Sequence, residues 1–141
     1  MKKEDFEYGN LNIGIEGKYI YTGENCIIII NTEIFDEETI EYVSKLEEKY
    51  LKVQDKILDF MLDKGVRDFY NNIYGYSDEY IKDNIGKSYI CIDSKKDEEH
   101  PNWNFNFAGV IKFCENKLDE HLISIEFMDD LEMCDYVQID G

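Results

Sequence analysis

One long helical repeat of apolar residues constrains the fold of this chain more than any other feature. Its members lie three or four positions apart, at Ile40, Val43, Leu46, Tyr50, Val53, Ile57 and Phe60. This spacing places them on one face of an α-helix. Asp36 is a suitable N-cap, and Gly65 is a typical residue just beyond a helix end. The pattern predicts a helix over residues 37–64 with one buried face.

Alternation of apolar and polar residues on both sides of this helix is typical of half-buried strands. The predicted strands cover residues 10–16, 19–21, 26–31, 89–92, 102–114, 123–127 and 133–139, and Gly109 suggests a bulge. The run 26–31 is β-branched, as in a central strand. Two short helices, over 66–73 and 77–86, fit the residues between the helix and the later strands.

This order of elements predicts an α+β fold in a single domain over residues 1–141. No repeat, linker or low-complexity tract divides the chain. Short links between neighbouring strands imply antiparallel pairing. We expect a two-layer domain, in which a mostly antiparallel sheet of at least five strands packs against the long amphipathic helix 37–64.

The cysteines and the N-terminus indicate a cytoplasmic protein. Cys26, Cys91, Cys114 and Cys134 stand apart and form no C-x-x-C pair, which excludes a zinc ribbon or thioredoxin motif. We expect reduced, buried thiols. The N-terminal residues contain no apolar stretch of a signal peptide, and the longest apolar run, 26–30, is too short to cross a membrane.

No motif predicts catalysis, a cofactor or a metal site. The P-loop, the nucleophile elbow, the zinc-protease motif and the EF-hand loop are all absent. The nearest approach to a metal-binding set is Asp93, Asp97, Glu98, Glu99 and His100. These residues lie in a polar loop, and nothing in the sequence fixes their geometry. We predict no catalytic residue, no cofactor and no bound metal ion.

Charge is the feature that bears most on function. The chain has 32 acidic and 15 basic residues, a net charge of −17. This charge opposes direct contact with nucleic acid or an anionic membrane and favours encounter with a basic partner. Residues 37–64 carry only −3, whereas residues 115–141 carry nine acidic residues and one lysine. A concentration of like charge costs self-repulsion, so we interpret the acidic C-terminal segment as functional; the alternative is that it only keeps the protein soluble.

Within that segment the acidic residues fall on a turn and on the last predicted strand. Asp129 and Asp130 should protrude from the turn, and Glu132 and Asp135 should flank them on opposite faces of the strand. Regular alternation places Asp135 on the otherwise apolar face. There it is an inward charge that protects a sheet edge, a buried and paired carboxylate, or a site residue.

The segment Asp97-Glu98-Glu99-His100, the aromatic alternation after it and the acidic closing hairpin resemble small bacterial families of unknown function. In those families a long helix precedes an Asp-Glu-Glu-His-Gly segment that opens a strand. Several of them are similar to immunity proteins encoded beside polymorphic toxins. The similarity spans roughly residues 10–140; this chain has Pro101 in place of the glycine and lacks the tryptophan before the acidic residues. The resemblance implies no catalytic residues.

We therefore expect an acidic interaction protein, most concretely an immunity protein that binds and neutralises a basic toxin such as a nuclease. The alternatives are a DNA mimic that inhibits a nucleic-acid-binding enzyme, an enzyme with an unrecognised site, and a domain with only a structural role. The predicted partner-binding residues are Asp97, Glu98, Glu99, Trp103, Asp129, Asp130, Glu132 and Asp135. We expect no direct nucleic-acid contact and no membrane contact.

Overall fold

The computed structural model describes the backbone of residues 1–11 and 15–140, and their side chains except at 10, 11, 15–17, 132 and 133. Within this range seven strands form one sheet, in which the spatial order follows the chain. They are β1 (Glu7–Leu11), β2 (Ile15–Thr22), β3 (Cys26–Asn31), β4 (Ser88–Lys95), β5 (Phe107–Phe113), β6 (Leu122–Met128) and β7 (Asp130–Asp140). The predicted α+β class and the minimum of five strands are confirmed.

All neighbouring strands are antiparallel except β3 and β4, which run parallel. The parallel pair follows from the chain path, because every α-helix lies between these two strands. The helices are α1 (Glu37–Met61), α2 (Arg67–Tyr74) and α3 (Asp78–Asn84). A π-helical segment, η3 (Leu62–Val66), joins α1 to α2, and short 3-10 turns cover Lys3–Asp5 and Thr32–Ile34. None of these helices is both long and apolar enough to span a membrane.

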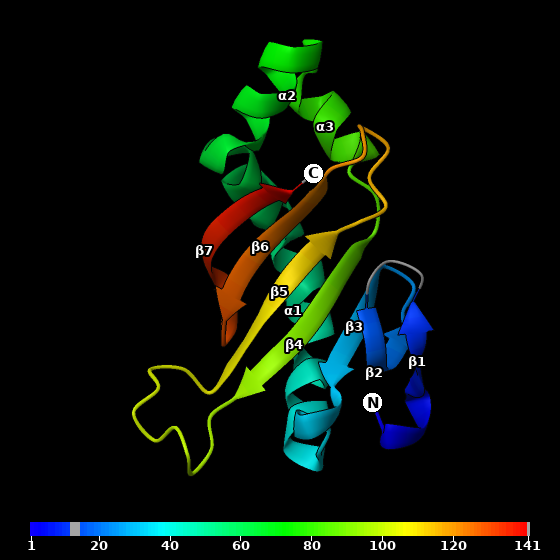
Figure 1. Ribbon diagram of the computed structural model, residues 1–141, viewed down its shortest axis with the longest axis vertical. Helices are drawn as coiled ribbons and strands as arrows, with labels where there is room; N and C mark the ends of the chain where they lie inside the picture. The colour runs from blue at the N-terminus through cyan, green and yellow to red at the C-terminus, as the bar shows by residue number, and fades with distance from the viewer. Residues whose placement is uncertain (12–14, 141) are drawn as a thin grey trace.

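Helix α1 lies along one face of the sheet, as its apolar period predicts (Figure 1). Asp36 caps it by accepting a hydrogen bond from the Thr39 backbone N–H at 2.8 Å. The predicted face is confirmed by six buried residues, Ile40, Val43, Leu46, Tyr50, Val53 and Ile57. They pack against sheet residues such as Ile28 and Ile90, which are fully buried.

Gly65 kinks the helical path and does not end it as the sequence suggested. The backbone leaves helical geometry at Lys64 and Gly65, where Gly65 has a φ of 121°, and then continues into α2. Such a φ is accessible to glycine and strained for other residues. The two short helices expected after it are confirmed as α2 and α3, and Ser77 caps α3 through the Tyr80 N–H.

Three strand predictions need correction. The expected strand 10–16 corresponds to parts of β1 and β2, which pair with each other, and residues 12–14 lie outside the described range. The expected strand 102–114 begins only at Phe107, so Trp103 and Phe105 belong to a loop. The bulge falls on β4 at Asp93 and not on β5 at Gly109. Gly109 marks a close approach instead, since a Cβ there would lie 2.1 Å from the Cys91 carbonyl oxygen.

Candidate partner-binding site

The β4–β5 loop, residues 96–106, projects from one end of the sheet (Figure 1). Its base is closed by a hydrogen bond of 2.8 Å from the Lys96 N–H to the Asn106 carbonyl. Beside it, Lys95 bridges from β4 to the start of α1, with its Nζ 2.6 Å from Asp36 and 3.0 Å from Glu38. The loop therefore leaves the sheet from a fixed base.

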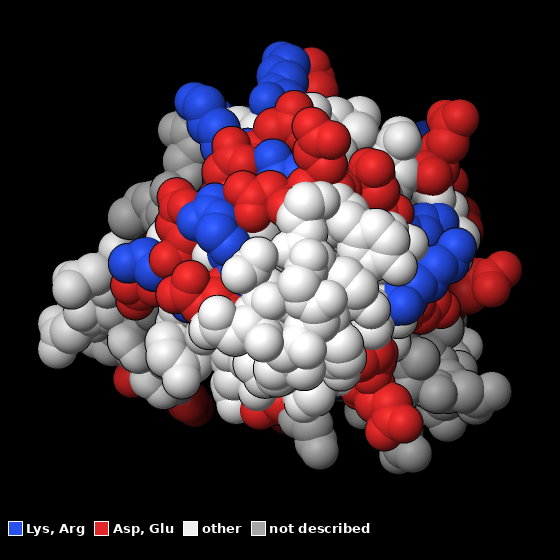
Figure 2. All heavy atoms as spheres, turned by 90° about the horizontal axis from the view of Figure 1, so that it is seen from above, with Lys and Arg blue, Asp and Glu red and all other residues white. Residues whose placement is uncertain are grey.

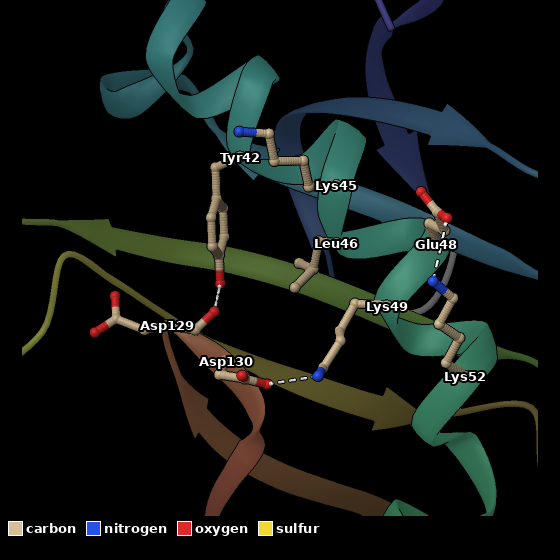
Figure 3. A pocket seen from close by; sticks show the side chains of 8 residues that line it. All are labelled: Tyr42, Lys45, Leu46, Glu48, Lys49, Lys52, Asp129 and Asp130. Carbon is tan, nitrogen blue, oxygen red and sulfur yellow. Dashed lines mark hydrogen bonds and ion pairs between the residues drawn. The ribbon is translucent and has the colours of Figure 1, made fainter.

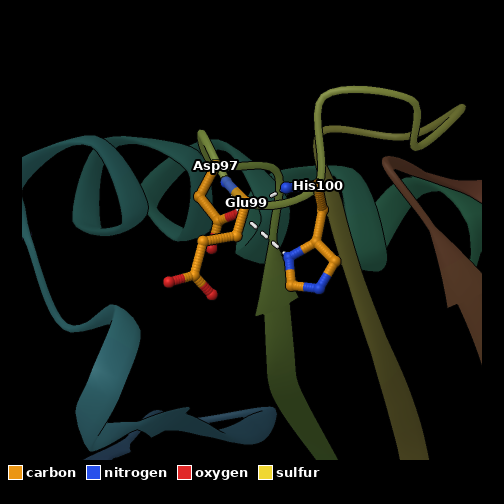
Figure 4. A group of neighbouring side chains, drawn as sticks. All are labelled: Asp97, Glu99 and His100. Atoms are coloured by element: carbon orange, nitrogen blue, oxygen red, sulfur yellow. Dashed lines mark hydrogen bonds and ion pairs between the residues drawn. The ribbon is translucent and has the colours of Figure 1, made fainter.

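The acidic tip of this loop is an ordered turn built around Asp97 (Figure 4). Asp97 Oδ1 accepts hydrogen bonds from the backbone N–H groups of Glu99 and His100, at 3.0 and 2.9 Å. The His100 ring nitrogen Nδ1 lies 2.9 Å from the same oxygen. These contacts, led by the one from the His100 side chain, lower the pKa of Asp97. Asp97 thus stays ionised and holds the turn.

The same turn is where a metal ion would find ligands. Ligand atoms of Asp97, Glu99 and His100 lie within 4.8 Å of one another, and all three residues are exposed. No sequence pattern indicates this arrangement of ligand atoms, which comes from the turn that Asp97 caps. Two of the ligand groups, those of Asp97 and His100, already contact each other. The absence of a bound metal stays a prediction.

Aromatic rings follow the acidic tip and stack on one another. The ring centroids of His100 and Trp103 are 4.0 Å apart with an interplanar angle of 21°, and those of Trp103 and Phe105 are 4.8 Å apart at 26°. The alternation of aromatic residues with asparagines in this segment predicted a strand. Its rings contact each other in sequence, and the stack leads from the loop tip to the sheet.

At the foot of the stack lies a hollow of about 270 Å³ on the sheet face opposite α1. Phe105 and Met128 supply apolar wall, and three carboxylates from three different strands line it: Asp93 of β4, Glu126 of β6 and Asp135 of β7. Within the described residues, none of these three forms an ion pair. We call this feature the acidic hollow.

Asp93, at the β4 bulge, is a residue of the acidic hollow whose pKa is raised. Although the residue is exposed, loss of water around its carboxylate raises its pKa, against the opposite effect of Lys112 and Lys18. A raised pKa means that the charged form is under-stabilised. A cation that binds in the hollow would stabilise the charged form of the Asp93 carboxylate.

Asp135 reaches this hollow because of a bulge, which corrects the predicted alternation. The pairing of β6 with β7 shifts between Glu126–Tyr136 and Phe127–Cys134, so Asp135 is the extra residue. Cys134 and Val137 pack against the core on the α1 side, while Asp135 is exposed on the other face. A bulge re-aims a side chain in this way. Asp135 is therefore neither an inward charge nor a buried pair.

Asp129, by contrast, connects three parts of the structure through hydrogen bonds, which we call the clasp. Its Oδ1 accepts hydrogen bonds from the backbone N–H groups of Asn106 and Phe107, both at 2.8 Å. Its carbonyl accepts the Tyr42 hydroxyl at 2.5 Å, and its φ is +43°. The clasp joins the β6–β7 turn, the foot of the β4–β5 loop and α1. Its carboxylate does not protrude toward a partner as expected.

Whereas Asp135 lines the acidic hollow on the other face of the sheet, Asp130 points toward α1 (Figure 3). There Asp129 and Asp130 line a hollow of about 480 Å³ together with Tyr42, Leu46, Glu48 and the lysines 45, 49 and 52. Asp130 lies 3.8 Å from Lys49, and Lys52 lies 3.3 Å from Glu48. Local charges here are mixed, so this side is not an acidic surface.

The structure thus brings together part of the predicted site. Asp97, Glu98, Glu99 and Trp103 share the projecting loop, and Asp135 lies at its foot. The Asp129 carboxylate is taken up by the N–H groups at the loop foot, Asp130 faces α1, and the Glu132 side chain lies outside the described residues. Sequence reasoning missed Phe105 and Glu126 as site residues and considered Asp93 only as a metal ligand. Only the pairing of β4, β5, β6 and β7, which no local pattern reveals, gathers them.

The acidic hollow and its loop can bind a cation, because they offer carboxylates and stacked rings. The thiols are poor nucleophiles at neutral pH, since burial raises the pKa of Cys26 to about 11 and that of Cys91 to about 12. All four cysteines are free.

Known proteins add no further constraint on this site. A search of protein-family profiles, of curated proteins and of solved structures gave no match to this chain.

Proposed function

We propose that the protein binds a basic protein partner at the loop end of its sheet, and that it does so as an immunity protein that neutralises a basic toxin. One observation carries the proposal: three carboxylates that form no ion pair among the described residues, those of Asp93, Glu126 and Asp135, line a hollow at the foot of an aromatic and acidic loop. The proposed contact surface is the acidic hollow together with residues 96–106.

A lysine or arginine side chain is the natural occupant of the acidic hollow. Its charge would pair with carboxylates that form no ion pair within the described residues, and its flat face or stem would lie on Phe105. The raised pKa of Asp93, caused by loss of water, favours such an arrival because a cation stabilises the charged carboxylate. Arginine is also among the side chains that dominate binding energy at interfaces.

The net charge of −17 supports the proposal at longer range. A protein of this charge attracts a basic partner before contact, which raises the association rate and makes that rate depend on salt. Glu98 and Glu99 are exposed at the loop tip and extend this field outward. An acidic protein seated on a nuclease would also cover the cationic surface that its substrate needs.

The test begins with capture of a partner from a lysate of the native host. The wild-type protein is compared with the double variant Glu126→Lys/Asp135→Lys. The matched control, Glu24→Lys/Asp55→Lys, makes the same change in net charge at exposed positions that do not line the acidic hollow. The captured protein is identified, purified and used for association kinetics at two salt concentrations and for inhibition of its activity.

We expect a basic partner whose activity is inhibited by wild type and by the control. For the hollow variant we expect an association rate at least about tenfold lower. An acidic partner, or equal rates for the hollow variant and the control, would contradict the proposal. Inhibition restricted to enzymes that act on nucleic acid, with loss spread over carboxylates along a whole face, would instead favour a DNA mimic.

A further inference from the structure

A second surface lies at the opposite end of the molecule, on α2 and α3 (Figure 1). Three large apolar side chains there are open to solvent: Ile73 is 56% exposed, Tyr74 44% and Tyr80 45%. Tyr76 lies between them, half-buried. Figure 2 views the molecule from this end and shows an uncharged area bordered by both acidic and basic side chains. We call Ile73, Tyr74, Tyr76 and Tyr80 the tyrosine surface.

The rings of this surface form one continuous cluster. Tyr74 and Tyr76 are stacked with centroids 5.0 Å apart, and Tyr76 and Tyr80 follow at 4.5 Å. Beneath them Tyr70 is fully buried and stacks on both Tyr74 and Tyr76, at 6.0 and 6.4 Å. The exposed rings therefore rest on a ring that belongs to the core.

Hydrogen bonds and the turn between the helices hold these rings in place. Asp119 accepts the Tyr70 hydroxyl at 2.8 Å on one oxygen and the Tyr74 hydroxyl at 3.2 Å on the other. Gly75, with a φ of 71°, ends α2 and returns the chain so that Tyr76 lies over Tyr70. Rings that are fixed before binding lose little conformational entropy when a partner arrives.

The two basic residues of α2 and α3 are paired, whereas several carboxylates on these helices and in the nearby β5–β6 loop are not. Arg67 is bound by Asp63 and Asp78, and Lys82 by Asp59 at 2.5 Å. Exposed carboxylates there that form no ion pair among the described residues include those of Asp68, Glu79, Asp83 and Glu120. Glu120 is close enough to Tyr74 to contribute to the raised pKa of that tyrosine, after burial and Asp119.

We infer that the tyrosine surface is a second docking site, for a protein segment that combines apolar side chains with lysine or arginine. Apolar groups would cover Ile73 and Tyr80, and cations would lie over the rings and pair with the rim carboxylates. A second copy of this chain fits poorly, because a symmetric contact would set rim carboxylates against each other. This inference rests on residues apart from the acidic hollow and does not depend on the proposed function.

The test uses a defined probe and the full-length chain. A fluorescent synthetic peptide in which leucine and arginine alternate is titrated against wild type, with a peptide that has citrulline in place of arginine as the neutral control. The apolar variant is Ile73→Ala/Tyr80→Ala, and the rim variant is Glu79→Gln/Asp83→Asn, which keeps every ring. Tyr8→Ala, at a tyrosine that is 63% exposed on β1 and lines neither surface, is the matched control.

We expect saturable binding of the arginine peptide that is weakened about tenfold or more in both the apolar and the rim variants and is unchanged by Tyr8→Ala. The citrulline peptide should bind at least about tenfold more weakly than the arginine peptide. Equal binding of the two peptides, or equal losses in the Tyr8 control, would overturn the inference. So would self-association of the wild type in sedimentation that Ile73→Ala/Tyr80→Ala abolishes, because the occupant would then be a second copy.

Discussion

At the scale of single residues, the acidic side chains of this protein have different structural roles that residue type alone does not distinguish. Asp97 and Asp129 accept backbone hydrogen bonds and shape turns. Asp119 holds two tyrosine hydroxyls, and burial opposes its ionisation while hydrogen bonds from His121 and Tyr70 lower its pKa. Asp93 and Asp135 have no such partners and face the acidic hollow. Composition predicts the charge but not this division.

Asp129→Ala should destabilise the protein by about 1–3 kcal/mol, because two backbone N–H groups lose their acceptor and alanine is strained at a positive φ. Asp129→Asn should stay close to wild type, since asparagine tolerates this backbone conformation and keeps an acceptor oxygen. Urea unfolding measures both, with Glu98→Ala as an exposed acidic control. Equal stability of the alanine and asparagine variants would show that the clasp has no energetic role.

Asp93→Asn should raise the free energy of unfolding at pH 7. The pKa of Asp93 is raised in the folded protein by loss of water, so the charged form weakens the fold above that pKa. The penalty fades as the pH falls through the raised pKa and is absent below the pKa of about 3.9 in the unfolded chain. Urea midpoints of the two proteins should therefore converge in acid. A variant that is less stable than wild type at pH 7 would contradict the assignment.

At the scale of elements, the helix period and most of the strand alternation were reliable, and the failures lie at strand ends and bulges. The period of α1 predicted six residues of its buried face, because a helix is closed by its own hydrogen bonds; Phe60 is only half-buried, and Leu58 and Met61 are buried in addition. The alternation over residues 102–106 failed, because a strand needs a neighbour and here Asp129 takes the two N–H groups at the loop foot. Gly65 is a residue type that commonly ends a helix, and the backbone leaves helical geometry at Lys64 and Gly65. The buried residues Leu62 and Val66 lie on either side of this break, and the chain continues into α2.

The core of α1 offers a stability test at this scale. Leu46 is 4% exposed and lies between helix and sheet, so Leu46→Ala should cost about 2–5 kcal/mol of unfolding free energy. Leu51, on the same helix but 47% exposed, is the matched control, and Leu51→Ala should change stability by about 0.5 kcal/mol or less. Thermal and urea unfolding report both. Similar losses at the two positions would mean that α1 does not pack through the predicted face.

At the scale of the whole molecule, two surfaces lie at opposite ends of a sheet with one helical layer (Figure 1). The acidic hollow combines residues from β4, β5, β6 and β7 and the loop between the first two, a set that no segment of sequence reveals. The tyrosine surface is local to α2 and α3, and its signal was visible as tyrosines at 70, 74, 76 and 80. Tyrosines at this spacing are as typical of the edge of a core as of a binding surface, and only the ring contacts and exposures distinguish the two.

The central claim is tested most directly by mapping where the basic partner binds on the surface of the protein. Amide hydrogen exchange of the free protein is compared with that of its complex with the captured partner. The account predicts slower exchange in residues 96–106 and 126–136, which frame the acidic hollow, with little change in residues 44–52 on the lysine-lined side of α1. Protection confined to the α1 side, or absent from both segments that frame the hollow, would contradict the claim that this protein meets its partner there.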